Sequence, residues 1–292
     1  MDINVISEIK CLLGEGPYWD DYSDRIFWVD ILNSKIYECD PQSENYSSYE
    51  VGQLIGCVVP GKDPDVVYLG LLNGYASFSK SNNELKMISD PEPGLNNNRF
   101  NDGKCDVMGR FWAGTMSMKD EPRQGALYCM AQDLSVKKKI PGVSVSNGLV
   151  WSLDHKTMYY IDTMTFQIVA YDFNPETGDI TNPGVAVVIP ENSGYPDGMT
   201  IDNEGKLWVA HWEGSQVCRW DPVSGNRIAS IKLPVSKPTS CTFGGENFDR
   251  LFITSARVDI SDEQLAREPL AGSLLVVDGL DVQGRKVNRF GV

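Results

Sequence analysis

The chain has 292 residues, of which 41% are hydrophobic and 10% aromatic, and its 40 acidic and 26 basic residues give a formal net charge of −14. This composition is that of a globular protein with a large core. The acidic balance argues against nucleic acid or an anionic membrane as a partner, because a surface that binds either needs clustered Lys and Arg.

The amino-terminal residues 1–8 lack the basic start and the long apolar core of a secretory signal. No apolar run in the chain approaches the roughly 18 residues that a membrane-spanning helix needs. The seven cysteines form no Cys-x-x-Cys pair and are odd in number, which is typical of reduced thiols packed in a core. We therefore expect a cytoplasmic protein.

Residues 3–13 are predicted to form a strand that precedes the first repeating unit of the chain. We expect it to pair with the strand around residues 273–277, because that pairing would close a ring of units and remove an open edge. A short helix is predicted after Ser261, where Ser261–Gln264 has the form of a capping box and Pro269 ends the run. The first and fourth units contain the clearest matching strand pairs, at residues 25–30 and 35–40, and 158–162 and 168–172.

A turn, strand, turn, strand pattern organises the chain. In residues 195–210, a Pro-Asp-Gly turn is followed by an apolar strand, then by an Asp-Asn-Glu-Gly turn and by a second strand, Leu-Trp-Val-Ala. The pattern recurs so that one polar side chain stands four residues before each inner apolar position. These side chains belong to Glu15, Asn101, Asn147 and Asp197.

The spacing of these four residues predicts the fold. Two gaps are 46 and 50 residues, and the third, of 86, is about twice the length of a usual unit. Further units near residues 57 and 241 bring the number to six. Repeats of this length, each with several short strands, predict an all-β, six-bladed β-propeller that forms one domain over residues 1–292.

The inner strands of a propeller line a central channel, so residues at one phase of the repeat converge at one mouth of the axis. Asp or Asn before Gly is ordinary turn chemistry in any single unit. Glu15, however, lies between two glycines and before Pro17, where a glutamate has no particular merit in a turn. A functional site therefore accounts better for the set.

Glu15 and Asp197 offer negative oxygen ligands and Asn147 a neutral one, which suits one divalent cation with open positions: Ca²⁺, Mg²⁺, Mn²⁺ or Zn²⁺. The alternative is a pair of carboxylates without a metal, one of which would have a raised pKa. The chain has only two histidines, which argues against a His-rich zinc site and a Ser-His-Asp triad. His155 lies in a predicted turn, and His211 is interpreted as a polar strand end.

Arg99 lies among amides just before Asn101. Together these two side chains would hold a polar, partly carbohydrate-like ligand. The alternative is an ion pair between Arg99 and the neighbouring Asp102. Residue types alone leave both possibilities open.

Several separated motifs resemble the senescence marker protein (regucalcin), gluconolactonase and luciferin-regenerating enzyme family, in the family's order and over nearly the whole chain. The motifs are Gly14–Pro17, Asn97–Lys104, Ala113–Met116, Ser146–Leu149, Pro196–Met199 and Thr239–Gly245. The resemblance implies a six-bladed propeller with a single divalent metal held by Glu15, Asn147 and Asp197. It also implies that Arg99 and Asn101 contact a sugar lactone.

One segment departs from the family pattern. After Gly-Thr-Met, the animal members carry acidic residues that face the substrate, whereas this chain has Ser117-Met118-Lys119 before Asp120 and Glu121. The metal site survives this change. The identity of the preferred sugar is left open.

These observations lead to the hypothesis of a metal-dependent hydrolase that opens a sugar-acid lactone, with Asp197 as general base. The alternatives are a non-catalytic, calcium-binding regulatory protein that uses the same ligands, a propeller scaffold for protein partners, and a hydrolase of organophosphates or larger lactones. The sequence predicts a small-molecule sugar lactone as the partner and no obligate protein partner.

Overall fold

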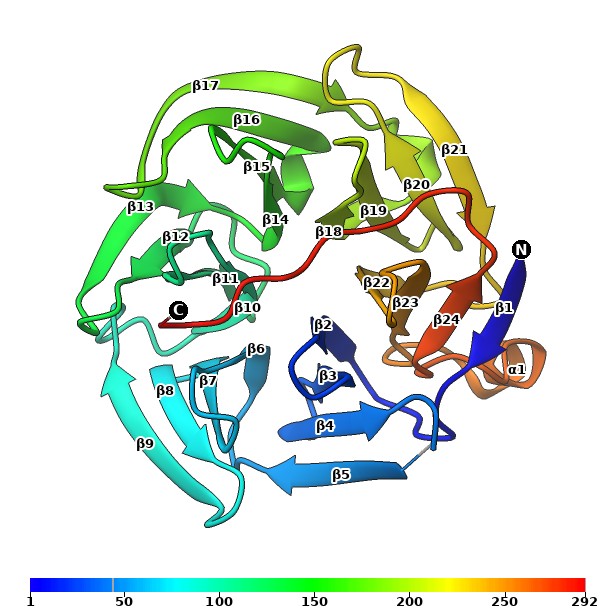
Figure 1. Ribbon diagram of the computed structural model, residues 1–292, viewed down its shortest axis with the longest axis horizontal. Helices are drawn as coiled ribbons and strands as arrows, with labels where there is room; N and C mark the ends of the chain where they lie inside the picture. The colour runs from blue at the N-terminus through cyan, green and yellow to red at the C-terminus, as the bar shows by residue number, and fades with distance from the viewer. Residues whose placement is uncertain (44, 292) are drawn as a thin grey trace.

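Six four-stranded antiparallel sheets surround a central axis, which confirms the predicted six-bladed propeller (Figure 1). The computed structural model describes residues 1–43 and 45–291. The first three blades follow one another in chain order, each with its first strand innermost. They contain β2 (Gly14–Asp20), β3 (Arg25–Asp30), β4 (Lys35–Asp40) and β5 (Asn45–Glu50); β6 (Ile55–Pro60), β7 (Val66–Leu71), β8 (Gly74–Ser79) and β9 (Glu84–Ser89); and β10 (Asn98–Cys105), β11 (Phe111–Ser117), β12 (Gly125–Met130) and β13 (Val136–Val143).

The next two blades repeat this arrangement, and the sixth is completed by the amino-terminal strand. None of the helices in the described part of the chain has the length and hydropathy of a membrane span. The remaining strands are β14 (Ser146–Trp151), β15 (Thr157–Asp162), β16 (Gln167–Asn174) and β17 (Asp179–Val188); β18 (Tyr195–Ile201), β19 (Leu207–Trp212), β20 (Gln216–Trp220) and β21 (Arg227–Lys232); and β22 (Pro238–Gly244), β23 (Arg250–Ser255), β24 (Leu275–Asp278) and β1 (Asp2–Val5).

The ring is closed by antiparallel pairing of β1 with β24, from Asp2 opposite Asp278 to Val5 opposite Leu275. The predicted closure is confirmed, but the predicted extent of the strand, residues 3–13, is wrong. After Val5 the chain must leave the outer edge of blade six and cross to the channel, where β2 begins. It therefore cannot remain in one ladder; single backbone hydrogen bonds from Ile6 and Cys11 and an isolated bridge at Leu13 follow.

A buried aspartate fixes the point at which the chain enters an inner strand. The Asp30 carboxylate, at the end of β3, accepts hydrogen bonds from the backbone amides of Leu12 (2.9 Å) and Leu13 (3.1 Å). Asp162, at the end of β15, accepts equivalent bonds from residues 144 and 145, both 3.0 Å long. These bonds hold the chain immediately before Glu15 and Asn147.

The Asp-x-x-Gly-x-x-Trp pattern that revealed the repeat has a structural role. The carboxylates of Asp106 and Asp202 accept hydrogen bonds from the indole N–H groups of Trp112 and Trp208, each 2.9 Å long. The glycine of each turn has a positive φ, 70° and 75°, which favours glycine. The hydrogen bond from tryptophan to aspartate thus links the turn after the inner strand to the second strand of the blade.

Apolar side chains fill the spaces between neighbouring blades. Tyr75 of β8 packs against Phe100 of β10 and Phe111 of β11, with ring centroids 4.6 and 5.3 Å apart. All seven cysteines are buried, as expected for core residues. Phe100 precedes Asn101, so this aromatic cluster supports the strand that carries part of the predicted site.

The predicted short helix is confirmed as α1 (Asp262–Arg267), whose N-cap residue Ser261 accepts a hydrogen bond from the amide of Gln264. In the described residues there are also two single turns of 3-10 helix, at Thr163–Thr165 and Glu191–Ser193.

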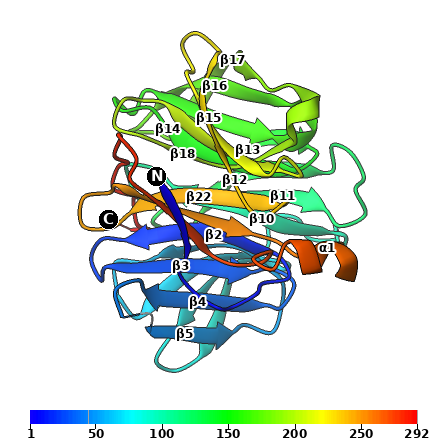
Figure 2. The same cartoon turned by 90° about the vertical axis from the view of Figure 1, so that its right-hand side faces the viewer.

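The carboxy-terminal residues 279–291 cross the face of the propeller opposite α1, as the two views show together (Figures 1 and 2). Isolated bridges join this tail to three blades, through Gly284, Asn288 and Phe290. Phe290 is 3% exposed, and its ring lies 4.2 Å from that of Tyr68. The tail is thus anchored across the ring.

Replacing the buried ring at the end of the tail should destabilise the whole propeller. We expect Phe290→Ala to lower the free energy of unfolding by about 3–5 kcal/mol, because it leaves a cavity between the tail and blade two. Urea denaturation measures the change. Val223→Ala, at a side chain 91% exposed, is the matched control and should stay within about 0.5 kcal/mol of wild type. A loss below about 1 kcal/mol for Phe290→Ala would show that the tail is not part of the cooperative unit.

Candidate active site

Each inner strand contains a β-bulge close to the start of the strand, and the bulges explain how the predicted residues reach the channel. The register shifts begin at Glu15, Phe100, Ser146 and Pro196 in β2, β10, β14 and β18. In β2 the shift begins at a predicted site residue, Glu15. In the other three strands a predicted site residue comes directly after the start of the shift: Asn101, Asn147 and Asp197. A bulge breaks the alternation of side chains and re-aims the one at the break.

The two remaining inner strands have the same bulge but offer no free polar side chain there. Thr239 in β22 donates its hydroxyl to the carbonyl oxygen of Gly14, 2.6 Å away. Gly56 in β6 has no side chain, and a Cβ atom there would lie 2.3 Å from the carbonyl oxygen of Phe100. Of the six bulge positions around the channel, four therefore carry a polar side chain that is available to a ligand.

The structure brings all five predicted residues together around one cavity of about 380 Å³ at the mouth of the channel. Each is between 4% and 8% exposed. The polar groups form the floor, and the walls are mainly apolar, as in many pockets for small molecules. The five residues are Glu15, Arg99, Asn101, Asn147 and Asp197; the walls contain Leu13, Ile31, Leu32, Met116, Val145, Tyr195, Trp212 and Val258.

Hydrogen bonds fix the two amide side chains. Asn101 Nδ2 donates to Asn147 Oδ1 (3.0 Å) and to the carbonyl oxygen of Ser146 (2.8 Å). Asn147 Nδ2 donates to Thr163 Oγ1 (2.8 Å), and Thr163 Oγ1 donates to the carbonyl oxygen of Pro196 (2.8 Å). Because Asn147 Nδ2 donates to Thr163 and Asn147 Oδ1 accepts from Asn101, the orientation of this amide is fixed, with its oxygen toward Asn101.

Arg99 does not form the alternative ion pair with Asp102. Its Nη1 donates to Asn101 Oδ1 (2.6 Å) and to the carbonyl oxygen of Phe100 (2.9 Å). Burial lowers the pKa of Arg99 to about 10, against the opposing effect of the charges of Glu15 and Asp197. The guanidinium is therefore positive at neutral pH and faces the two carboxylates.

Glu15 and Asp197 are two buried acids that shift each other's ionisation. Burial, with the charge of Asp102 as the next cause, raises the pKa of Glu15 to about 8. Burial and the charge of Glu15 raise the pKa of Asp197 well above its usual value. The chain by itself therefore resists the presence of both negative charges.

The donor set fits a divalent cation. Two carboxylates and one amide oxygen, fixed from three blades, are the hard ligands that Ca²⁺, Mg²⁺ and Mn²⁺ prefer. The raised pKa values indicate that a positive charge is needed for both acids to ionise together. Among the residues that the structure describes, no three His, Cys, Asp or Glu side chains form a metal cluster, so the amide of Asn147 is essential to this set.

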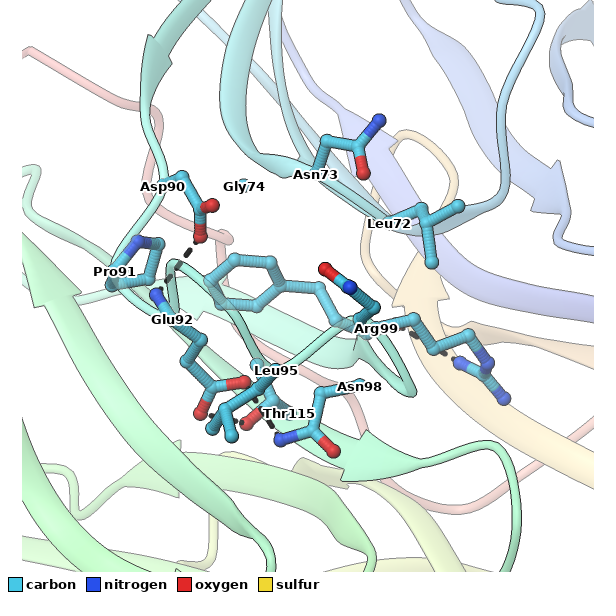
Figure 3. Close-up of a pocket in the computed structure, with 12 residues that line it drawn as sticks. Leu72, Asn73, Gly74, Asp90, Pro91, Glu92, Leu95, Asn98, Arg99 and Thr115 are labelled. Carbon is cyan, nitrogen blue, oxygen red and sulfur yellow. Dashed lines mark hydrogen bonds between the residues drawn. The ribbon is translucent and has the colours of Figure 1, made fainter.

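A second polar cavity, of about 270 Å³, lies beside Arg99 and contains a carboxylate that is already fully engaged (Figure 3). Glu92 Oε1 accepts hydrogen bonds from Thr115 and Tyr128, and Oε2 accepts one from Asn98, all 2.9 Å long. The guanidinium of Arg99 points away from Glu92. Glu92 therefore anchors the segment that leads into β10 and so positions Arg99.

The two histidines lie outside the cluster. His211 is fully buried; its Nδ1 lies 3.0 Å from the carbonyl oxygen of Ser193, and burial lowers its pKa to about 4. This confirms the interpretation of His211 as a strand end. His155 lies in the turn between β14 and β15, with a φ of 58°.

Sequence reasoning missed several residues around the cavity. Thr163 links Asn147 to the strand of Asp197, yet a threonine after a strand carries no sequence signal. Asp120 also lines the cavity. It follows the segment that departs from the family pattern, and that departure was the available signal. Tyr195 and Trp212 were visible only as members of strands.

Fold and site together define a class: a six-bladed propeller with a buried, oxygen-rich cluster at one mouth of its channel. The family model described as "SMP-30/Gluconolactonase/LRE-like region" matches residues 13–257. The chain belongs to this family, which confirms the resemblance seen in the motifs.

Similar proteins cover the chain almost end to end. Regucalcin of Gallus gallus is 39% identical over 287 residues, 97% of this chain and 96% of that protein. A Bacillus subtilis (strain 168) protein named "Putative sugar lactone lactonase YvrE" is 37% identical over 94% of both chains. Among solved structures, a luciferin-regenerating enzyme has a TM-score of 0.93 at 31% identity, covering 100% of this chain and 99% of that one. Regucalcin of Agrobacterium tumefaciens, described as a calcium-binding protein, has a TM-score of 0.93 at 28% identity, with coverage of 99% and 97%.

The buried acids predict a pH dependence of stability in the metal-free protein. The unfolded chain releases the Glu15 proton near pH 4.5, whereas the folded chain keeps it until about pH 8. Folding therefore takes up a proton in this window, and the free energy of unfolding should fall as pH rises through it, by up to about 1.4 kcal/mol per pH unit for each proton. Urea denaturation of chelator-treated protein at several pH values measures the slope.

Two variants isolate the origin of that slope. Glu15→Gln should flatten it, and Glu84→Gln, at an exposed position of β9, should leave it unchanged. Equal slopes for Glu15→Gln and wild type would contradict the assignment of the proton to this site.

Proposed function

We propose that the protein is a metal-dependent hydrolase that opens a sugar-acid lactone of the aldono-1,4- or 1,5-lactone type. The observation that carries the proposal is the set of two buried carboxylates and one fixed amide oxygen on the floor of the 380 Å³ cavity. Membership of a family that includes gluconolactonases supports it. So does the similarity to a protein named as a sugar lactone lactonase.

Glu15, Asn147 and Asp197 would hold the cation. When bound there, a divalent cation would polarise the lactone carbonyl as a Lewis acid and favour the ionised forms of the two acids. Asn147 is held for this task by its bonds to Asn101 and Thr163.

Asp197 would act as general base. Its carboxylate lies on the cavity floor at a bulge, within reach of water that enters the cavity from the mouth. In its ionised form it would accept the proton of a water molecule as that water attacks the lactone carbonyl carbon. The ring ester bond then breaks, and the leaving alkoxide takes up a proton to give the hydroxy acid.

Arg99 and Asn101 would orient the sugar. Asn101 holds Arg99 Nη1 at 2.6 Å, which leaves the other guanidinium nitrogen atoms available to hydroxyl groups of a ligand. Asp120, on the wall, would accept a further hydroxyl hydrogen bond in place of the acidic residues that the Ser117-Met118-Lys119 segment lacks. A fixed orientation of the lactone brings its carbonyl close to Asp197.

A calcium-binding regulatory role would use the same three ligands, and the similarity to a protein described as calcium-binding favours it as the second candidate. The large cavity with Arg99 on its floor distinguishes the two roles, because ion storage alone needs no space for an organic ligand.

The proposal is tested by the hydrolysis of pentono- and hexonolactones by chelator-treated protein, before and after addition of Ca²⁺, Mg²⁺, Mn²⁺ or Zn²⁺. Activity should return with at least one ion. With that ion present, Asp197→Asn should lower kcat by at least about 10²-fold, because it replaces a charged ligand by a neutral one and removes the base. Asp133→Asn, in an exposed turn of blade three, is the matched control and should keep full activity.

Unfolding curves check that each variant is folded. Full activity after removal of the metal, or substantial turnover by folded Asp197→Asn, would contradict the proposed chemistry. Calcium binding without hydrolysis of any lactone would favour the regulatory role instead.

A further inference from the structure

A third cavity, which we call the rear cavity, lies at the other mouth of the channel, where the tail crosses the ring. The tail pairs Asn288 with Cys105, at the end of β10, and Gly284 with Asp202, just after β18. The candidate active site lies near the starts of the same strands. Four residues separate Asn101 from Cys105, so the two sites are roughly 13 Å apart along the strand.

This rear cavity has a volume of about 270 Å³ and lies between the tail and three inner strands. Its lining contains several basic side chains and no Asp or Glu, although the chain as a whole has 40 acidic and 26 basic residues. Lys104, His155, Arg285 and Lys286 are the basic residues of the lining.

Arg285 distinguishes the cavity from an ordinary salt-bridged surface. Its neighbours in the tail are paired: Lys286 with Asp21 at 2.7 Å and Arg289 with Asp20 at 2.8 Å. Within the described part of the chain, Arg285 has no ion pair and no hydrogen-bond acceptor. A guanidinium has five donors and no acceptor, so it calls for an anionic or carbonyl partner.

Two other walls of the cavity carry buried ring nitrogen atoms without partners. In the described residues, neither Trp151 Nε1 nor His155 Nδ1 has a hydrogen-bond partner. Arg285 and His155 line the same cavity, and burial, followed by the charge of Arg285, lowers the pKa of His155 below its usual value. Buried polar atoms without a partner are costly unless a ligand or water completes their hydrogen bonds.

Two carboxylates outside the lining, those of Asp154 and Asp106, also affect the pKa of His155, and both already accept hydrogen bonds from other groups. Asp106 accepts hydrogen bonds from Arg110 and Trp112. Asp154 accepts from Ser152 and from the amide of Lys156. Neither forms an ion pair with Arg285 among the described residues.

We propose that the rear cavity binds a phosphate group, with Arg285 as its principal ligand and His155 and the indole N–H of Trp151 as further donors. Lys104 Nζ already donates to the carbonyl oxygen of Met199 (2.7 Å), so Lys104 contributes positive charge beside the site. The tail supplies Arg285 and β14 supplies Trp151, so the site requires the tail to lie across the ring. Arginine forms bidentate hydrogen bonds with phosphate oxygens, which gives both affinity and orientation. The phosphate group belongs to inorganic phosphate or to a small phosphate monoester. The site is independent of the proposed lactonase activity.

Isothermal titration of the full-length, phosphate-free protein with inorganic phosphate, at an ionic strength held constant with potassium chloride, tests the site. We expect saturable binding of one phosphate per chain. Arg285→Gln should weaken it at least about tenfold, because hydrogen bonds to a charged group contribute about 1.5–3 kcal/mol. Lys86→Gln, which removes one positive charge from an exposed position of β9, should leave the affinity unchanged.

A second variant and a second ligand complete the design. His155→Asn, which tolerates the positive φ of this turn, should also weaken phosphate binding in a protein with unchanged thermal stability. Glycerol phosphate in place of inorganic phosphate distinguishes the two sources: tighter binding identifies a monoester site, and weaker binding a site for the free ion. Absence of saturable binding, or equal affinity in wild type and Arg285→Gln, would overturn the proposal.

Discussion

The structure depends on one geometric constraint: six inner strands must run side by side around a single axis, and each must turn out of its ladder where it meets the mouth of the channel. The β-bulges meet this constraint, and in four of the strands they also aim a polar side chain at the axis. Residues as distant in sequence as Glu15 and Asp197 become neighbours without any loop that reaches across. The carboxylates of Asp30 and Asp162 hold the chain just before two of these positions.

The cluster at this mouth conflicts with the stability of the propeller. Two carboxylates at 4% and 7% exposure would repel each other if both were ionised, and Arg99 compensates only part of their charge. If selection acted on stability alone, we would expect apolar side chains in place of such a pair, because buried charges are costly. Their presence is understandable if the working state of the protein contains a cation. Around them, Asn101, Asn147 and Thr163 are fixed by hydrogen bonds, so the unfavourable electrostatics is concentrated at the acids.

Much of the fold and of the cluster could be predicted from the sequence, since turn chemistry repeats at a fixed spacing. Asp106 and Asp202 are visible because each anchors a tryptophan six residues later, and the repeat then dictates which residues share the channel mouth. Thr163 could not be predicted, because its role comes from the spatial approach of β15 to β18. The length of β1 was wrong, because the path from the outer edge to the channel is set by ring closure. The rear cavity also escaped prediction: Arg285 lies in a tail without periodicity, and only its crossing of the channel brings it near Lys104 and His155.

The central claim is that Glu15, Asn147 and Asp197 exist as a set in order to bind one divalent cation. Anomalous diffraction from crystals grown with Mn²⁺ at neutral pH tests it most directly, because the ion is located without any assumption about the reaction. The account predicts one strong peak at coordination distance from the carboxylates of Glu15 and Asp197 and from Asn147 Oδ1, and its loss in Glu15→Gln crystals. A peak elsewhere in the chain, or none between these three side chains, would contradict the account.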